Sequence, residues 1–261
     1  MDYVVICLVA LLVSGLTLFS GFGVGTLLMP AFALFFPVPV AVAATAVVHL
    51  ANNVFKVFLV GRKADWSVVI RFALPAAAAA MIGALLLALF AQVPPLFSYY
   101  LGERLYTATV VKLVIGLVII AFALVDLLPR FSALAVDRKY LPLGGLLSGF
   151  FGGLSGNQGA LRATFLIKAG LSKEAFIGTG TVSAVIVDIA RLLVYGLSFY
   201  TVNLQLVGGK VGGLVLAAII AAFLGAFLGA RLIPKMTLRS VQLIVGAMLV
   251  LVGLGMVSGL F

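Results

Sequence analysis

Long apolar runs, separated by short breaks that contain glycine, proline or charge, fill almost the whole chain. Most runs approach or exceed about 20 residues, the length that an α-helix needs to cross a bilayer. The apolar residues follow one another continuously instead of alternating at every second position, which disfavours a membrane β-barrel. The runs cover approximately 3–20, 26–36, 38–60, 67–91, 107–128, 140–152, 160–168, 174–197, 204–230 and 238–260.

Two of these runs are short, and each follows a glycine-rich break. The breaks lie at 20–25 and at 152–159. Glycines at this density predict a chain that leaves a helix and then re-enters it. The pattern therefore predicts an all-α polytopic membrane protein with about eight transmembrane helices, in two halves that each open with a broken, re-entrant hairpin.

The chain also repeats itself after 135 residues. In so apolar a sequence, only polar and glycine matches that keep one order are informative. We therefore predict two homologous halves, 1–130 and 140–261, joined by a loop at 131–139. Such duplication is common in secondary transporters, whose substrate site lies near the midplane at discontinuous helices. The shift places Ser20-Gly21 on Ser155-Gly156, Asn53 on Asp188, Lys56 on Arg191 and Gly61 on Gly196.

The loop charges leave open whether the two halves run parallel or inverted. If all eight predicted spans cross the membrane fully, six Lys and Arg residues fall on one side and seven on the other. Orientation follows a clear excess of Lys and Arg in the cytoplasmic loops. The sequence therefore predicts neither the relative direction of the halves nor the side on which the termini lie.

The overall composition excludes a soluble protein. Of the 261 residues, 64% are hydrophobic and 9% are charged, whereas soluble domains are about 45–50% apolar and about a quarter charged. The net charge of +10 would suggest nucleic acid in a soluble chain, but no soluble domain is predicted here. Pairs such as Arg62-Lys63 sit in short loops, where they face lipid headgroups or set topology. The first run lacks a basic leader and a cleavage site, so we expect it to stay as a membrane helix.

A polar stripe crosses the run at 38–60. His49, Asn52, Asn53 and Lys56 have the spacing i, i+3, i+4, i+7 and therefore share one helix face. Because an ionised group at the bilayer centre costs at least about 2.5–3.5 kcal/mol, such a stripe must face protein or water. One interpretation is a lining that donates hydrogen bonds to an anion. The other is that the amides join helices while Lys56 extends its amine to the membrane surface.

A second polar group lies in the run at 174–197. Asp188 and Arg191 stand three residues apart, so the simpler interpretation is an ion pair within one helix. Asp188 is also the one acidic residue deep within an apolar run. If the protein uses a proton gradient, Asp188 and His49 are the titrating candidates, and the Arg191 guanidinium could bind an oxyanion in bidentate fashion.

The second glycine-rich break carries a further candidate site. A helix that restarts after a break exposes free backbone N–H groups, which favour an anion. The alternative is close packing of helices through glycine, with the two amides capping the backbone. The polar side chains at this restart are Ser155, Asn157, Gln158 and Arg162, with Gly156 between them and Ser20 and Gly21 as their counterparts in the first half.

Several kinds of chemistry are excluded by what the chain lacks. One histidine and one cysteine cannot form a multi-histidine or cysteine-rich metal site, and no Walker P-loop is present. We therefore expect no metal, no cofactor and no enzymatic activity. An anion channel, a carrier of another small anion and a non-transport scaffold remain as alternative functions.

Three motifs resemble the sulfite exporter TauE/SafE family of membrane permeases, and the resemblance covers essentially the whole chain. Phe22, Val24 and Thr26 interrupt the denser glycine run that is usual in the first motif of that family. The motifs are Ser20-Gly-Phe-Gly-Val-Gly25 followed by Pro30, then His49 with Asn52-Asn53 and Lys56, and Gly152-Gly-Leu-Ser-Gly-Asn-Gln-Gly-Ala-Leu-Arg162.

The resemblance implies a multi-pass carrier in the inner or plasma membrane of a bacterial-type cell. Its cargo would be sulfite or an organosulfonate, moved by a proton or membrane-potential gradient. The partners implied are this small anion and the lipid bilayer, and a homodimer is compatible with the sequence.

We therefore predict a midplane oxyanion site between the two glycine-rich hairpins. Asp188, together with His49, is the predicted proton-coupling pair. The predicted substrate-binding residues are Ser20, Gly21, His49, Asn52, Asn53, Lys56, Ser155, Gly156, Asn157, Gln158, Arg162 and Arg191.

Overall fold

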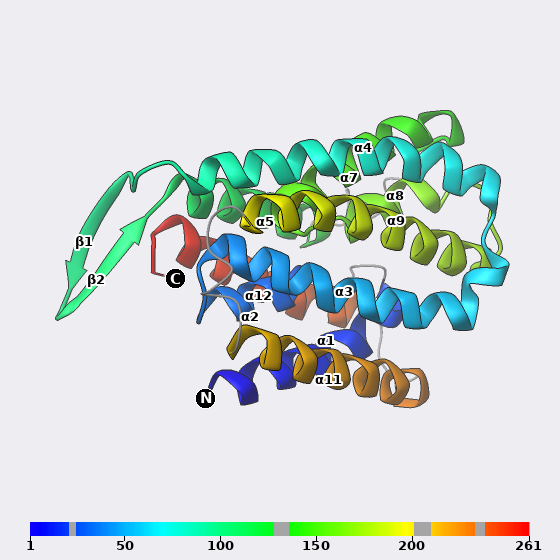
Figure 1. Cartoon of the computed structure of the whole chain (residues 1–261). Helices are drawn as coiled ribbons and strands as arrows, with labels where there is room; N and C mark the ends of the chain where they lie inside the picture. Colours follow the sequence, from blue (N-terminus) through cyan, green and yellow to red (C-terminus); the bar gives the residue numbers. More distant parts are fainter. Residues whose placement is uncertain (21–24, 128–135, 201–209, 233–237, 261) are drawn as a thin grey trace.

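A computed structural model describes residues 1–20, 25–127, 136–200, 210–232 and 238–260 as an elongated bundle of helices (Figure 1). The predicted helices are confirmed to within a few residues at most of their ends. They are α1 (Asp2–Ser20), α2 (Gly25–Ala33), α3 (Val38–Val60), α4 (Trp66–Ala91), α5 (Val110–Leu127), α7 (Leu141–Ser155), α8 (Gly159–Leu166), α9 (Lys173–Tyr200), α11 (Lys210–Leu232) and α12 (Leu238–Val257), with short 3-10 turns η1 (Gly61–Lys63) and η2 (Arg138–Tyr140).

Four of the described helices are long and apolar enough to span a membrane, namely α3, α4, α9 and α11. Shorter apolar helices lie within α1, α5 and α12. Large apolar side chains cover the outside of the bundle, as Phe58 at 82% and Leu197 at 74% exposure illustrate. Such a surface is stable in lipid and not in water, so the chain is a multi-pass membrane protein.

One stretch departs from the all-α prediction. The tyrosine-rich segment after α4 forms an antiparallel hairpin of β1 (Phe97–Leu101) and β2 (Arg104–Ala108), which projects from one end of the bundle (Figure 1). Tyr99 and Tyr106 lie opposite each other and stack with ring centroids 5.8 Å apart. Aromatic and β-branched residues favour such pairs. Gly102 makes the reversal with a φ of +65°, which a side chain would disfavour.

Glycines bring α7 against α4 with little space between the backbones. A Cβ atom on three glycines of α7 would come within 2.2 Å of carbonyl oxygens of α4. Helices in membranes commonly associate through small residues at this four-residue spacing, because the backbones can approach closely. The pairs are Gly145 with Phe72 at 2.2 Å, Gly149 with Ala76 at 1.9 Å and Gly153 with Ala80 at 2.0 Å.

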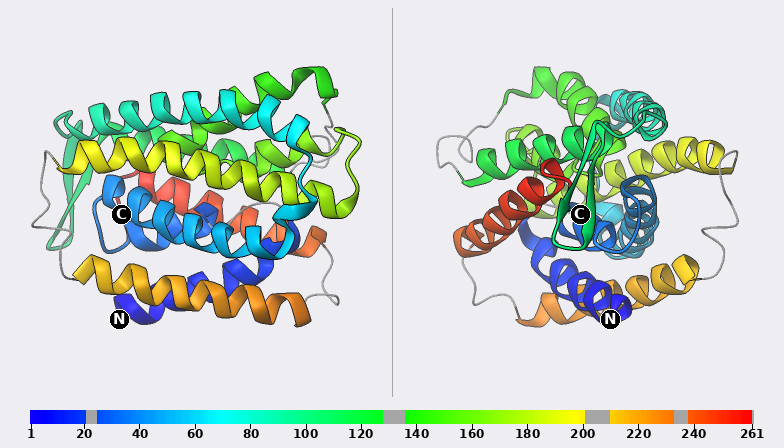
Figure 2. Two further views of the ribbon diagram at one scale, coloured as in Figure 1. Left: turned by 45° about the vertical axis from the view of Figure 1, so that its right-hand side comes forward. Right: turned by 90° about the vertical axis from the view of Figure 1, so that its left-hand side faces the viewer.

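Helices α3 and α9 pack together near the middle of the bundle and run in opposite directions (Figures 1 and 2). Early residues of α3 share a groove with late residues of α9, as Val40 does with Leu192. Late residues of α3 share another groove with early residues of α9, as Val57 does with Val182. The polar stripe of α3 therefore crosses the polar group of α9 near the middle of both helices.

The chain also turns back on itself between α7 and α8. Helix α7 ends at Ser155, Gly156 takes a left-handed φ of +83°, and α8 begins at Gly159. A Cβ on Gly144, near the start of α7, would meet the ring of Phe165, near the end of α8. The chain therefore returns toward the end of the bundle from which α7 started. The corresponding break in the first half, at 21–24, lies outside the described residues.

Candidate functional site

The polar stripe of α3 contacts α9 through His49. Its Nδ1 atom lies 2.6 Å from Asp188 Oδ2, and both side chains are buried. Asn53, one turn further along α3, places Nδ2 at 3.0 Å from His49 Nδ1 and donates to Asp188 Oδ2 at 3.5 Å. Three predicted residues from opposite halves of the chain thus form one buried polar cluster.

Asp188 and Arg191 form the ion pair that their spacing indicated. Arg191 donates to Asp188 Oδ1 from Nε at 3.0 Å and from Nη2 at 2.7 Å. Its Nη1 donates to the carbonyl oxygen of Gly152 at 2.9 Å, at the end of α7. Gln158 also donates to Asp188 Oδ1, at 3.0 Å from Nε2. The Arg191 guanidinium therefore connects α9 to the helix break, with all three of its nitrogen atoms in use.

The break itself is ordered by side chains that satisfy its backbone. Ser148 donates to the carbonyl oxygen of Gln158 at 2.9 Å, and Ser155 donates to that of Phe151 at 2.9 Å. Tyr195 donates its hydroxyl proton to the carbonyl oxygen of Gly153. These contacts fix the direction in which the chain leaves α7 at Asn157 and Gln158. Ser148 was not predicted from the sequence.

The start of α2 lies against this break. A Cβ on Gly25 would lie 3.1 Å from the carbonyl oxygen of Gly156, 3.7 Å from Thr45 Cγ2 and 3.9 Å from His49 Cδ2. The start of α2 thus lies close to the break between α7 and α8, beside the polar stripe of α3. The side chain of Ser20, at the end of α1, and the whole of Gly21 lie outside the described residues.

Some buried polar atoms have no hydrogen-bond partner among the described residues. Asn157 leaves both Nδ2 and Oδ1 free, and Arg162 leaves Nη1 free. A buried donor without a partner costs about 1–3 kcal/mol, so these atoms are available to a ligand or to water. The other such atoms are Thr45 Oγ1, Asn52 Nδ2 and Ser183 Oγ.

Ser183 was not predicted from the sequence, because one serine within an apolar helix usually bonds to its own backbone.

Lys56 is half-buried one turn beyond Asn53. Asn52 accepts from the Ser14 hydroxyl at 3.4 Å, which leaves its Nδ2 available.

The buried charges do not cancel. Asp188 is paired with Arg191 and His49, whereas Arg162 forms no ion pair within the part of the chain that the structure describes. Arg162 is only 9% exposed and sits on α8 beside Gly180 of α9. A buried guanidinium without a carboxylate requires a counter-ion, and a small anion could supply it.

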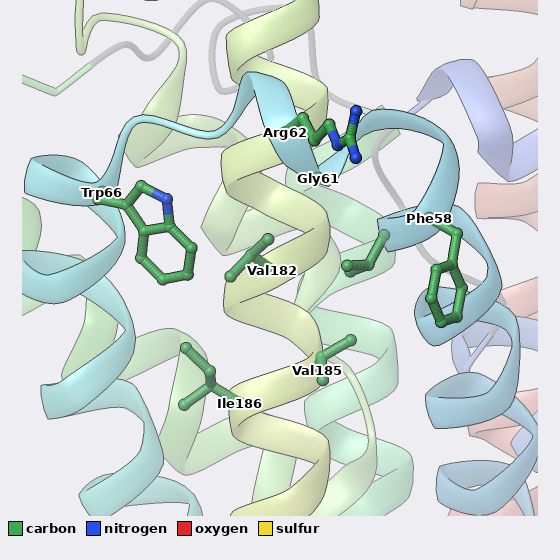
Figure 3. A pocket seen from close by; sticks show the side chains of 8 residues that line it. Phe58, Gly61, Arg62, Trp66, Val182, Val185 and Ile186 are labelled. Atoms are coloured by element: carbon green, nitrogen blue, oxygen red, sulfur yellow. The ribbon is translucent and has the colours of Figure 1, made fainter.

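Two grooves flank the crossing of α3 and α9, one toward each end of the bundle. The larger, of about 750 Å³, is lined by Val57, Val182 and Ile186, with Arg62 and Trp66 at its rim (Figure 3). The other, of about 270 Å³, is lined by Val40, Leu192 and Tyr195 together with the first turns of α11. Neither groove is lined by Asn157 or Arg162.

No group of three or more His, Cys, Asp or Glu side chains that could hold a metal ion occurs among the described residues. What the arrangement offers chemically is a set of hydrogen-bond donors and the positive charge of Arg162, which has no ion pair among the described residues. It therefore suits the binding of an anion.

One comparison with known proteins agrees with the resemblance seen in the motifs. The family model described as Sulfite exporter TauE/SafE matches residues 6–256. No curated protein and no solved structure matches the chain.

Proposed function

Because the chain belongs to the sulfite exporter TauE/SafE family, and so to membrane transporters of sulfur anions instead of enzymes, we propose a secondary carrier of sulfite or an organosulfonate. It would work in the inner or plasma membrane and bind its cargo at the break between α7 and α8. A proton or membrane-potential gradient would drive it, and a homodimer stays a prediction.

The observation that carries this proposal is that Arg162 and the amide of Asn157 are both buried and both have polar atoms without a partner among the described residues. An oxyanion would neutralise the guanidinium and accept from both side chains, and such charge-assisted hydrogen bonds are the strong ones. The restart of α8 adds backbone N–H groups that no helical carbonyl can reach. In this proposal Asn52 and Thr45 line the α3 side of the site, and Lys56 adds positive potential.

Arg191 takes a supporting role in the proposed site. Its guanidinium is occupied by Asp188 and by the Gly152 carbonyl oxygen. In this proposal it holds the break in place. Gln158 also donates to the Asp188 carboxylate. In the same way it positions the start of α8, next to Ser155 and Gly156.

We also propose that the two halves are inverted relative to each other, and the pattern of helix contacts supports this. Helix α7 packs on α4 of the other half, and its counterpart α1 packs on α11 of the other half. A Cβ on Gly83 of α4 would lie 2.1 Å from the Phe150 carbonyl oxygen of α7. On Gly225 of α11 it would lie 2.0 Å from the Leu11 carbonyl oxygen of α1. Together with the opposite directions of α3 and α9, this exchange supports inverted halves, a plan that many secondary transporters share.

Flux into proteoliposomes tests the site. Arg162→Gln is expected to raise the half-saturating concentration of sulfite about 10–100-fold, since a hydrogen bond to a charged group contributes about 1.5–3 kcal/mol. Asn157→Ala should raise it by a smaller factor. Labelled sulfite, sulfonates, sulfate and thiosulfate would be compared at equal concentrations.

Lys168→Gln is the matched control for Arg162→Gln, because Lys168 is a cation just after α8 that is exposed. Its flux should equal that of the unchanged chain. A folded Arg162→Gln chain with unchanged half-saturation would exclude Arg162 from the site. Flux that never saturates and never accumulates anion against a gradient would favour a channel instead.

Proton coupling predicts a separate result. His49→Gln keeps an amide donor near Asp188 but removes the titrating ring, which contacts the carboxylate at 2.6 Å. We expect an imposed proton gradient to stimulate flux in the unchanged chain and not in His49→Gln. Exchange of labelled for unlabelled anion, which needs no net proton movement, should continue in both. Stimulation that survives in His49→Gln would rule out this histidine as the coupling group.

A further inference from the structure

Exposed basic side chains gather at one end of the bundle. They lie on η1, on the early turns of α4, on η2 and on both sides of the connection between α8 and α9, which share the right-hand end of Figure 1. The seven whose exposure the structure describes are Arg62, Lys63, Arg71, Arg138, Lys139, Lys168 and Lys173.

Direct contacts join these segments into one surface, here called the basic end. The backbone N–H of Asp65, just after η1, donates to Thr179 Oγ1 near the start of α9 at 2.9 Å. Arg138 Nη2 of η2 lies 4.0 Å from Asp65 Oδ2. Arg71 on α4 and Lys168, just after α8, extend the same surface. Trp66, which is 61% exposed, lines the same groove as Arg62 at this end of the bundle (Figure 3).

The opposite end carries the chain termini and the β-hairpin, as both views in Figure 2 show. Tyr99 of β1 donates to the carbonyl oxygen of Ser258 at 2.7 Å, so the end of the chain lies beside the hairpin. Cations are few here. Lys112 donates to the Thr107 carbonyl oxygen at 2.7 Å, Arg104 is exposed at the hairpin turn, and Lys210 begins α11.

We propose that the basic end is the cytoplasmic face of the protein, in contact with anionic lipid headgroups, and that both termini and the β-hairpin lie on the outer side. Short cytoplasmic loops carry an excess of Lys and Arg, which sets the orientation of a membrane protein. The inner leaflet is rich in anionic lipids, which attract basic residues close to its surface. Exposed tryptophan, as at Trp66, is typical of the membrane–water interface on either side.

The orientation becomes readable only after the path of the chain is known. Helix α7 starts, and α8 ends, at the same end of the bundle. Lys168 and Lys173 therefore fall on the same side as Arg138 and Lys139. The count of eight full spans treated this broken hairpin as one crossing and so placed Arg138 and Lys139 on one side and Lys168 and Lys173 on the other. This orientation is independent of which anion is carried.

A matched pair of cysteine variants tests the orientation. Cys7 is the one cysteine of the chain, so both variants are made in Cys7→Ala. Glu103→Cys lies at the hairpin turn and Asp137→Cys at the start of η2, and each replaces an exposed carboxylate without removing a basic residue. The probe is a membrane-impermeant maleimide, applied to spheroplasts of a bacterial host before and after permeabilisation.

We expect Glu103→Cys to be labelled in intact spheroplasts and Asp137→Cys to be labelled at least tenfold more after permeabilisation. The reverse pattern would overturn the orientation, and so would labelling of both variants, or of neither, in intact spheroplasts. A second measurement uses fusions to the C-terminus of the unchanged chain. Alkaline phosphatase should be active there and green fluorescent protein dark, and the opposite pair of results would also overturn the proposal.

Discussion

Asp188→Ala is expected to lower the free energy of unfolding by about 3–5 kcal/mol, because it leaves the Arg191 guanidinium buried without its carboxylate. Both side chains are fully buried, and Asp188 also receives contacts from His49 and Gln158. The apparent melting temperature of the purified protein in detergent measures this loss. Transport should be absent in the same variant.

Two further variants separate the lost ion pair from other effects. Asp188→Ala combined with Arg191→Ala removes both charges and should recover part of the stability, while transport stays absent because the break has lost its anchor. Asp137→Ala removes an exposed carboxylate that lies 4.0 Å from Lys139 and should cost less than about 1 kcal/mol. If the double variant is no more stable than Asp188→Ala, an unpaired Arg191 is not the cause.

Gly149→Ala is expected to destabilise the packing of α4 against α7 by about 3 kcal/mol or more, at or beyond the upper end of ordinary overpacking. The added Cβ would lie 1.9 Å from the Ala76 carbonyl oxygen, and real Cβ atoms essentially never come within 3.0 Å of a neighbour. The opposing atom belongs to the backbone, so no side-chain rotation can relieve the contact. Because α7 leads into the break, sulfite flux should fall together with the melting temperature.

Gly196→Ala is the matched control for this change. Gly196 also lies inside a helix, α9, but a Cβ there would meet nothing within 4 Å. Alanine is the better helix former by about 0.8–1 kcal/mol, so the melting temperature should stay constant or rise slightly. If Gly149→Ala and Gly196→Ala have the same melting temperature, α4 and α7 are not in such close contact.

The sequence by itself determined the helices and the local relations within them. Uninterrupted apolar runs specify helices in lipid, because every backbone polar group must be paired inside its own segment. The spacing of Asp188 and Arg191 predicted their ion pair, and the glycines of 152–159 predicted the interruption that occurs at Gly156. Each of these depends on residues only a few positions apart. The sequence did not predict the hairpin of Phe97–Ala108. Its stabilising side-chain pairs, such as Tyr99 with Tyr106, join residues of two different strands.

Only the tertiary structure decided which polar groups meet and which stay unpaired. His49 and Asp188 are 139 residues apart, and Gln158 reaches the same carboxylate from a third helix segment. That Asp188 is satisfied by these groups while Arg162 is left without a carboxylate follows from packing, which no pattern along one helix contains. The side of each loop was likewise undecided, because one reversal between α7 and α8 changes the side of the connections that follow. Local spacing sets helices and their breaks, whereas the charge balance of the site and of the two membrane faces depends on the path of the whole chain.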